Sequence, residues 1–191
     1  MDVKEAVKQR RAYRSFEPVG ITKELIYDLA ESAQITASCF NNQPWQYVFV
    51  YEKEMLQKMH IVLSSGNEWA QKASLIIAAL GKKEDDCVIH DRIYYQFDIG
   101  MATSAMILRA TELGLVAHPI AGYSPKKTRE ILRIPDNIDV IALVIVGKKS
   151  NKINPDLSVK QIEEEKNRPE RKKIKDFVFH NKYGGKINDK N

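Results

Sequence analysis

The residues best suited to holding a small molecule form a short connector at residues 38–45, Ser-Cys-Phe-Asn-Asn-Gln-Pro-Trp. Its hydroxyl and amide groups can exchange hydrogen bonds beside the flat indole of Trp45, a combination that suits a planar heteroaromatic ligand. Ordinary helix-to-strand loops also use asparagine for turns and tryptophan for core filling. Taken alone, the connector favours the ordinary loop, so the rest of the chain must decide.

Two basic clusters are the second candidate binding feature. Arg10, Arg11 and Arg14 lie within five residues, and another cluster occupies residues 168–175. Guanidinium groups grip phosphate through paired hydrogen bonds, although such clusters also occur on solvated surfaces. The net charge of +5 makes nucleic acid an alternative partner. However, the clusters lack interleaved aromatic residues, and no helix-turn-helix or zinc finger stands out, so we expect no nucleic acid. Two separated basic clusters could equally hold a phosphorylated cofactor.

Few side chains are candidates for a nucleophile or an acid–base pair. Cys39 and Cys87 form neither a metal-ligand spacing nor a disulfide framework, and we expect Cys39 to be buried and inert rather than oxidisable. His90 and, less strongly, His118 could border a pocket, with neutral packing as the alternative. There is no Gly-x-Gly-x-x-Gly fingerprint, so a separate nicotinamide-binding domain is not expected.

Length and composition indicate one domain with a substantial core, or one domain plus an arm. The chain has 191 residues, of which 43% are hydrophobic and 29% charged. Its first five residues include charges and no apolar signal region, and the longest nearly charge-free run, residues 99–108, is too short to cross a bilayer. We expect a cytoplasmic protein with no membrane partner.

Hydrophobic periodicity predicts alternating helices and strands. Helices are expected at residues 2–11, 22–34, 53–63, 97–113, 124–132 and 157–166, and strands at 47–51, 74–80, 116–123 and 139–147. The helix at 97–113 is apolar on several sides, which suggests that a second subunit covers part of it. Residues 82–86 are expected to form a solvated charged loop. The composition becomes polar after residue 148, so we divide the chain into a domain at 1–150 and an arm at 151–191 that lies over a neighbour.

Taken in order, six segments of this chain resemble the FMN-dependent nitroreductase family. They are Arg-Arg-Ala-Tyr-Arg-Ser-Phe at 10–16, Asn-Asn-Gln-Pro-Trp at 41–45, Asp-Ile-Gly at 98–100 with an apolar helix to Glu-Leu-Gly-Leu at 112–115, Pro-Ile-Ala-Gly-Tyr at 119–123, the helix at 125–135 with the strand to 147, and the basic tail at 168–178. Their common order over residues 2–178 makes the match specific, and it favours the ligand-binding interpretation of the connector.

The resemblance implies an α+β fold, with a mixed, mostly antiparallel sheet flanked by helices, in an intertwined homodimer. It implies two FMN sites at the dimer interface and an arm that wraps the partner. The implied activity is an oxidoreductase that takes hydride from NADH or NADPH and reduces nitroaromatics, quinones or similar small electron-poor acceptors by a ping-pong mechanism. The alternatives are another flavin task (dehalogenation, flavin cleavage or enoate reduction) and a flavin-binding protein without efficient turnover.

The resemblance also implies which residues hold FMN. Arg10 would reach the phosphate and Arg14 the pyrimidine edge of the flavin, while Ala12 replaces a frequent serine and leaves only its backbone. Ser38 and Asn41 would approach the flavin from the partner subunit.

Residues near the ring and in the arm complete this set. Asn67 would reach the ring, and the backbone of Ala121 and Gly122 would orient flavin N5, so no catalytic side chain is required. The complete set of cofactor-binding residues is Arg10, Arg11, Ala12, Arg14, Ser38, Asn41, Gln43, Asn67, Pro119, Ile120, Ala121, Gly122, Arg168, Arg171 and Lys173.

Overall fold

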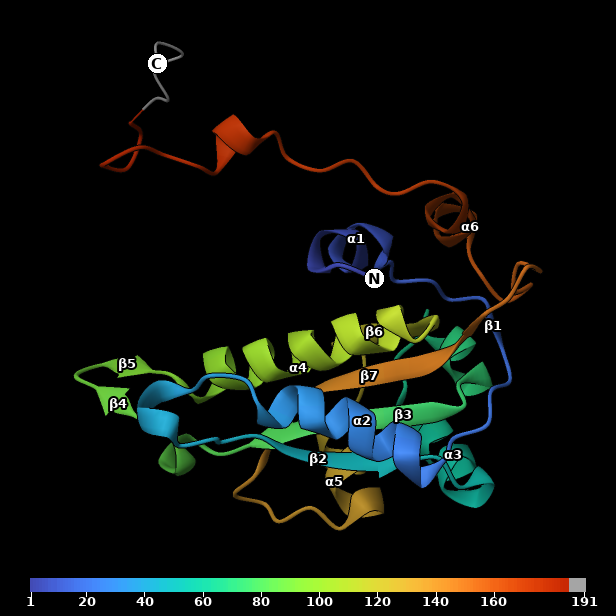
Figure 1. The fold of residues 1–191 in the computed structure, drawn as a ribbon. Coiled ribbons are helices and arrows are strands. Elements are labelled where there is room, and N and C mark those ends of the chain that lie inside the picture. The colour runs from blue at the N-terminus through green and yellow to red at the C-terminus, as the bar shows by residue number, and fades with distance from the viewer. Residues whose placement is uncertain (186–191) are drawn as a thin grey trace.

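A five-stranded sheet forms the centre of the computed structural model, which describes residues 1–185 (Figure 1). Its strands are β1 (Phe16–Glu17), β2 (Gln46–Val50), β3 (Leu75–Gly81), β6 (Leu115–Ile120) and β7 (Asp139–Lys149). β7 pairs with β1, β3 and β6, and β2 completes the sheet beside β3. The predicted α+β class is confirmed, and every pair of these strands is antiparallel, so the sheet is not mixed in the described part of the chain.

The two continuous apolar runs form the middle of this sheet, as the sequence predicts. Every residue of β3 is buried, and Ile77 pairs with Val144 of β7. Because side chains alternate across a strand, Ile76 and Ile145 face one core and Ile77 and Val144 face the other. A strand buried on both faces has no polar positions, which explains why these runs lack alternation.

Residues 1–185 contain six α-helices, four of which cover the two faces of the sheet. The six helices are α1 (Val3–Gln9), α2 (Lys23–Gln34), α3 (Lys53–Met59), α4 (Tyr95–Glu112), α5 (Pro125–Leu132) and α6 (Val159–Lys166). α2 and α4 pack against one face of the sheet, and α3 and α5 lie on the other (Figure 1). The predicted start signals hold, because Thr22 caps α2 through the Leu25 N–H at 3.2 Å and Ser124 caps α5.

The longest helix, α4, leaves one stripe of apolar side chains uncovered. Phe97 is 63% exposed, and Met101, Ala105 and Leu108 are only half-buried. The nearby helix α1 also exposes Val3 and Val7. None of the helices in the described residues is long and apolar enough to span a membrane.

Residues 82–86 form the predicted loop, with Lys83 and Glu84 exposed, but Asp86 is only 8% exposed. A small hairpin of β4 (Val88–Ile89) and β5 (Arg92–Ile93) follows it. Cys87 forms a disulfide with Cys39, with 6.2 Å between their Cα atoms. The expectation of unpaired cysteines was wrong, because 48 residues separate them and their approach depends on the tertiary fold.

The C-terminal part of the chain begins by returning to the body. Leu157 is buried in the core, and α6 packs near the segment that follows α1. Beyond Asn167 the chain runs outward past α1 (Figure 1), with Ile174 and Tyr183 exposed. The last six residues of the predicted arm, 186–191, lie outside the described residues.

Candidate functional site

The two basic clusters of the sequence meet at one cavity of about 120 Å³. Its lining consists of Arg10, Arg11, Ala12, Arg14, Glu164, Arg168, Pro169 and Arg171. Six of the predicted cofactor-binding residues therefore come together although they lie at the two ends of the chain. Lys173, the remaining basic residue of the prediction, is exposed and does not line the cavity.

Positive charge at this cavity is only partly neutralised. Arg14 pairs with Glu164 at 3.0 Å, but no acidic side chain within residues 1–185 pairs with Arg10. Burial, followed by repulsion from Arg168 and Arg171, lowers the pKa of Arg10. Guanidinium groups held together against their repulsion favour a bound anion, and their fork geometry suits phosphate.

Arg11 and Arg14 are held in place by the last turn of α6. Ser158 and Gln161 form a capping box that starts this helix. Near its C-terminal end, the carbonyls of Glu164 and Glu165 accept hydrogen bonds from Arg11 Nη2, the first at 2.6 Å. A cation near helix-end carbonyls is favourable because those groups lack partners in the helix. Arg168 Nη2 donates to the Lys8 carbonyl at 2.6 Å, so the chain ends are joined directly.

The buried side chain of His118 contacts the segment that carries Arg10, Arg11 and Arg14. Nδ1 of His118 lies 3.0 Å from the Tyr13 carbonyl, and its ring stacks on Trp69 with 4.7 Å between centroids. Burial, with Arg14 and Arg10 nearby, lowers its pKa to about 4. His118 is therefore neutral near pH 7 and donates from Nδ1 to the carbonyl. Its role in the structure is packing and positioning, which was the alternative weighed from the sequence.

The segment after β6 forms the second part of the candidate site. Asn67 Nδ2 donates to the Gly122 carbonyl at 3.0 Å, so two predicted ring-contacting residues are neighbours. A Cβ on Gly122 would overlap this amide, which accounts for glycine at this position. The N–H groups of Ala121 and Gly122 have no acceptor in the described part of the chain, and Ala121 is exposed. They are available to a ligand.

Pro119 and Ile120 are strand residues that position this segment. Both lie on β6, where Pro119 pairs with Val144 and Ile120 with Leu143. Ile120 is buried in the core, while Pro119 is exposed.

The predicted partner-facing residues lie at the other end of the molecule. Ser38, Asn41 and Gln43 belong to the loop between α2 and β2, beside the β4–β5 hairpin and away from α6 (Figure 1). Ser38 Oγ accepts a hydrogen bond from the Gln43 N–H at 2.9 Å, which closes the loop. One chain therefore forms the arginine cavity and the Asn67–Gly122 contact, and this loop contributes to neither.

The loop has an unusual backbone. Phe40, Asn41 and Gln43 have φ values of 48°, 58° and 51°, a region that non-glycine residues rarely adopt. Asp98, 2% exposed at the start of α4, accepts a hydrogen bond from the Cys39 N–H at 2.6 Å. Such backbone conformations persist where surrounding contacts enforce them, and they often mark functional sites.

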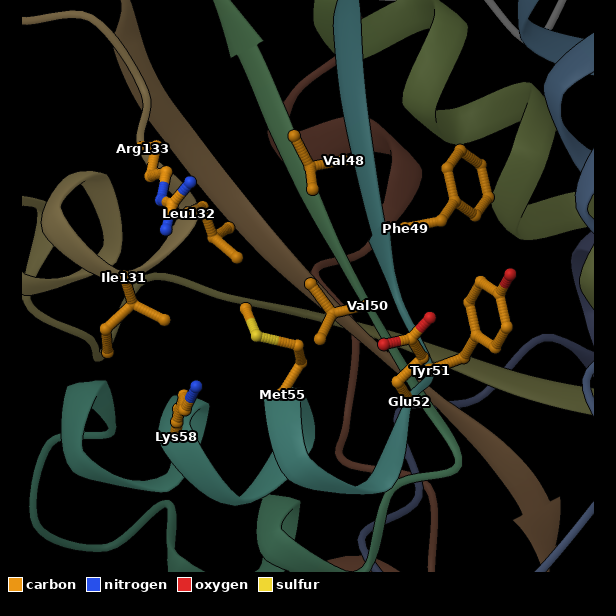
Figure 2. Close-up of a pocket in the computed structure, with 10 residues that line it drawn as sticks. All are labelled: Val48, Phe49, Val50, Tyr51, Glu52, Met55, Lys58, Ile131, Leu132 and Arg133. Atoms are coloured by element: carbon orange, nitrogen blue, oxygen red, sulfur yellow. The ribbon is translucent and has the colours of Figure 1, made fainter.

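A separate cavity of about 490 Å³ lies between β2, α3 and α5 (Figure 2). Val48, Val50, Met55 and Ile131 give it an apolar wall, with charged groups at Glu52, Lys58 and Arg133. None of the predicted site residues lines it. His90 is also outside the arginine cavity, at an exposed position between β4 and β5.

Comparison with known proteins identifies the family. Residues 7–148 match the model of the nitroreductase family. The chain belongs to this family. An Archaeoglobus fulgidus protein named as a candidate NADH dehydrogenase/NAD(P)H nitroreductase is 28% identical over 142 residues, 72% of this chain and 80% of that one. A Thermus thermophilus protein named NADH dehydrogenase is 24% identical, over 77% of this chain and 86% of its own.

Solved structures agree with this membership. A crystal structure described as an oxidoreductase containing FMN is 25% identical and superposes with a TM-score of 0.82, covering 97% of this chain and 95% of that one. A nitroreductase family protein from Clostridium difficile has a TM-score of 0.78 at 23% identity, over 95% and 99% of the two chains. The nitroreductase-like fold that the sequence motifs imply is confirmed.

Sequence reasoning missed the residues that hold the arginines in position. Glu164 and Glu165 lie in a charged stretch that is typical of a solvated helix face. Tyr13 lies between arginines, and its position indicates no role of its own. Their contacts with Arg11, Arg14 and His118 join segments more than 100 residues apart. No local pattern signals them.

Proposed function

We propose that this chain is an FMN-dependent oxidoreductase that uses NADH or NADPH to reduce small electron-poor acceptors such as nitroaromatics and quinones. The observation that carries the proposal is the cavity lined by five arginines from the two chain ends. A structural ion-pair network would carry matching acids, whereas Arg10 has none within residues 1–185 and its pKa is lowered by its basic neighbours. Family membership supplies the reason to choose FMN among phosphorylated ligands.

The residues of the cavity fit the phosphate of FMN. Three arginines offer N–H donors that do not pair with carboxylates, namely Arg10, Arg168 and Arg171. Ala12 can contribute only its backbone groups. Arg11 is already committed to the α6 carbonyls, so it shapes the cavity and adds charge. A phosphate dianion would relieve the repulsion among these groups.

The ring of the cofactor would lie toward Asn67 and the segment at 119–122. The N–H groups of Ala121 and Gly122 offer hydrogen-bond donors without acceptors in the described residues, and Asn67 fixes that backbone through the Gly122 carbonyl. Arg14 would place positive charge at the pyrimidine edge, balanced by Glu164. Preoriented donors of this kind cost little reorganisation when charge develops near them.

A second copy of the chain would complete the site. Ser38, Asn41 and Gln43 lie at the far end from the arginine cavity, and the uncovered stripe of α4 offers a surface over which two copies could pack (Figure 1). We propose a homodimer in which each site combines the arginine cavity of one protomer with the loop at 38–43 of its partner. The outward arm would then lie over the partner.

FMN, when bound, supplies the hydride-transfer chemistry that connects the nicotinamide donor with the acceptor. The protein contributes binding, orientation and charge, and no side-chain nucleophile is needed. Because donor and acceptor would use one site in turn, the proposal includes ping-pong kinetics.

The direct test is an absorbance spectrum of the purified protein before and after anaerobic addition of NADH or NADPH. The proposal expects a flavin spectrum, release of FMN on denaturation, and rapid bleaching by at least one nucleotide. Protein that neither carries nor binds FMN would contradict the cofactor assignment. A flavin spectrum that neither nucleotide bleaches would contradict the reductase activity and leave flavin binding alone.

A further inference from the structure

The Cys39–Cys87 disulfide joins two segments that flank the proposed site. Cys39 begins the helical turn at Cys39–Asn41, between Ser38 and Asn41, and Cys87 directly precedes β4. The separation of 6.2 Å between their Cα atoms lies in the usual range for disulfides. Both cysteines are half-buried, so a small thiol can approach the bond.

The hairpin at 88–93 has few other attachments to the body. β4 and β5 pair only with each other within the described residues, and Val88 and Ile93 are 46% and 47% exposed. Side-chain hydrogen bonds reach the preceding residues from Asn42 to Asp86 at 3.3 Å and from Gln46 to Asp85 at 3.5 Å. An isolated two-stranded hairpin is marginally stable in water, so the covalent bond contributes strongly to its position.

The loop at 38–43 also needs bonds to neighbouring segments to keep its backbone conformation. Its three positive φ angles are costly for residues other than glycine, at roughly 1 kcal/mol or more each. The disulfide and the bond from the Cys39 N–H to Asp98 hold the first of these turns. Release of the sulfur would leave the strained loop held by hydrogen bonds without a covalent link, among them those to Asp98, Ser38 and Asp86.

Two carboxyl groups lie beside the two cysteines. A carboxylate oxygen of Asp86 and both Sγ atoms lie within 4.8 Å of one another. Asp86 Oδ1 accepts from the Cys87 N–H at 2.8 Å, and its buried Oδ2 has no partner among residues 1–185. Burial, followed by repulsion from Asp86, raises the pKa of Asp98, whose Oδ2 accepts a hydrogen bond from the Cys39 N–H. The two cysteines therefore lie next to two buried carboxyl groups.

We propose that Cys39 and Cys87 form a reversible thiol–disulfide site that, in its oxidised form, fixes the hairpin at 82–94 against the loop at 38–43. The co-reactants are thiols of low molecular weight. A thiolate attacks one sulfur, breaks the Cys39–Cys87 bond and forms a mixed disulfide with one cysteine while the other leaves as a thiol. A second external thiolate then attacks the external sulfur of the mixed disulfide and releases the remaining cysteine. Two electrons and two protons end on the cysteines, and the external thiols become a disulfide.

The functional consequence rests on the proposed function. If Ser38 and Asn41 contact FMN across a dimer, reduction frees the loop that carries them and lowers the affinity for FMN. The hairpin lies beside the same loop, so reduction also changes access to the site from that side.

The experiment uses the full chain as apoprotein, purified without thiols and in the presence of a chelator. Mass spectrometry and thiol titration follow treatment with dithiothreitol and then with oxidised glutathione. We expect two thiols to appear on reduction and disappear on oxidation, and hydrogen exchange at residues 38–43 and 82–94 to accelerate about tenfold or more. The double variant Cys39→Ser/Cys87→Ser should exchange like the reduced protein and ignore dithiothreitol.

FMN titration supplies the second measurement. The reduced protein and the double variant should both bind FMN about fivefold or more weakly than the oxidised protein. Thiols that never pair in oxidised glutathione, or a bond that opens without faster exchange in these two segments, would overturn the proposal. These exchange results do not depend on FMN, so a protein that fails to bind FMN would contradict the proposed function while leaving the thiol–disulfide site supported.

Discussion

Acidification should destabilise this protein through His118. Its pKa is lowered to about 4 in the folded protein, whereas an unperturbed histidine has a pKa of about 6.5. The unfolded chain therefore takes up a proton as the pH falls below about 6.5, while the folded protein resists until about 4. The contribution to stability is complete above pH 6.5 and is lost as the pH falls through this window.

The size of the effect follows from these two values. Between pH 7 and pH 5 the linkage removes about 2 kcal/mol of unfolding free energy, and down to pH 4 about 3 kcal/mol. The physical source is the burial of the imidazole against Trp69 and beside Arg10 and Arg14, which disfavours a cation. Protonation also adds positive charge next to the arginine segment, because the His118 ring contacts the Tyr13 carbonyl of that segment.

The assay is urea unfolding of the apoprotein at pH 7, 6 and 5, with the wild type compared with His118→Gln and His118→Phe. Both variants lose some stability at every pH because the ring contacts change. The prediction concerns the slope: each variant should lose about 2 kcal/mol less than the wild type between pH 7 and pH 5. Equal slopes in all three proteins would refute the reasoning, since other groups would then account for the acid sensitivity.

Three further outcomes follow from the site. Arg10→Ala should weaken FMN binding about 10- to 100-fold by titration, because one charge-assisted contact to phosphate is lost, whereas Arg129→Ala on α5 should leave it unchanged. Gly122→Ala should lower the unfolding free energy by about 1–3 kcal/mol because its Cβ overlaps the Asn67 amide; Gly20→Ala, where the added atom meets nothing within 4 Å, should be nearly neutral, and equal effects would contradict this. A chain ending at Asn167 should still unfold cooperatively, but sedimentation should show that its dimer dissociates more readily. The full-length variant Arg168→Ala/Arg171→Ala should lose FMN affinity and keep the dimer. A truncated chain that dimerises like the wild type would exclude the arm from the interface.

Local signals predicted most of the secondary structure because they act within a few residues. Thr22 and the Ser124-Pro125 pair set the starts of α2 and α5, and Gly114, with φ of 75°, ends α4 as expected. The uniformly apolar runs located β3 and β7 because a strand buried on both faces has no other composition.

The errors concern contacts between distant segments. The prediction of a solvated loop at 82–86 fails at Asp86, which is buried and accepts a hydrogen bond from Asn42 of the neighbouring loop. The pairing of Cys39 with Cys87 and the grip of α6 on Arg11 have the same origin, since each depends on where the fold brings two segments.

The candidate site was accessible from the sequence only through the order of its motifs. Nothing local indicates that Arg10 and Arg171 share a cavity, and the resemblance supplied that expectation. The roles of Ser38, Asn41 and Gln43 stay predictions, because they depend on a second chain.

The central claim is that one FMN site combines the arginine cavity of one protomer with the loop at 38–43 of another. Its most direct test is FMN binding by Arg10→Ala, by Ser38→Ala/Asn41→Ala, and by the two variants co-expressed in equal amounts. Each variant alone should bind weakly, while a mixed dimer has one doubly altered site and one intact site. With random pairing, the account predicts tight binding at about one site per four protomers. No recovery of tight binding in verified mixed dimers would contradict a site shared between protomers.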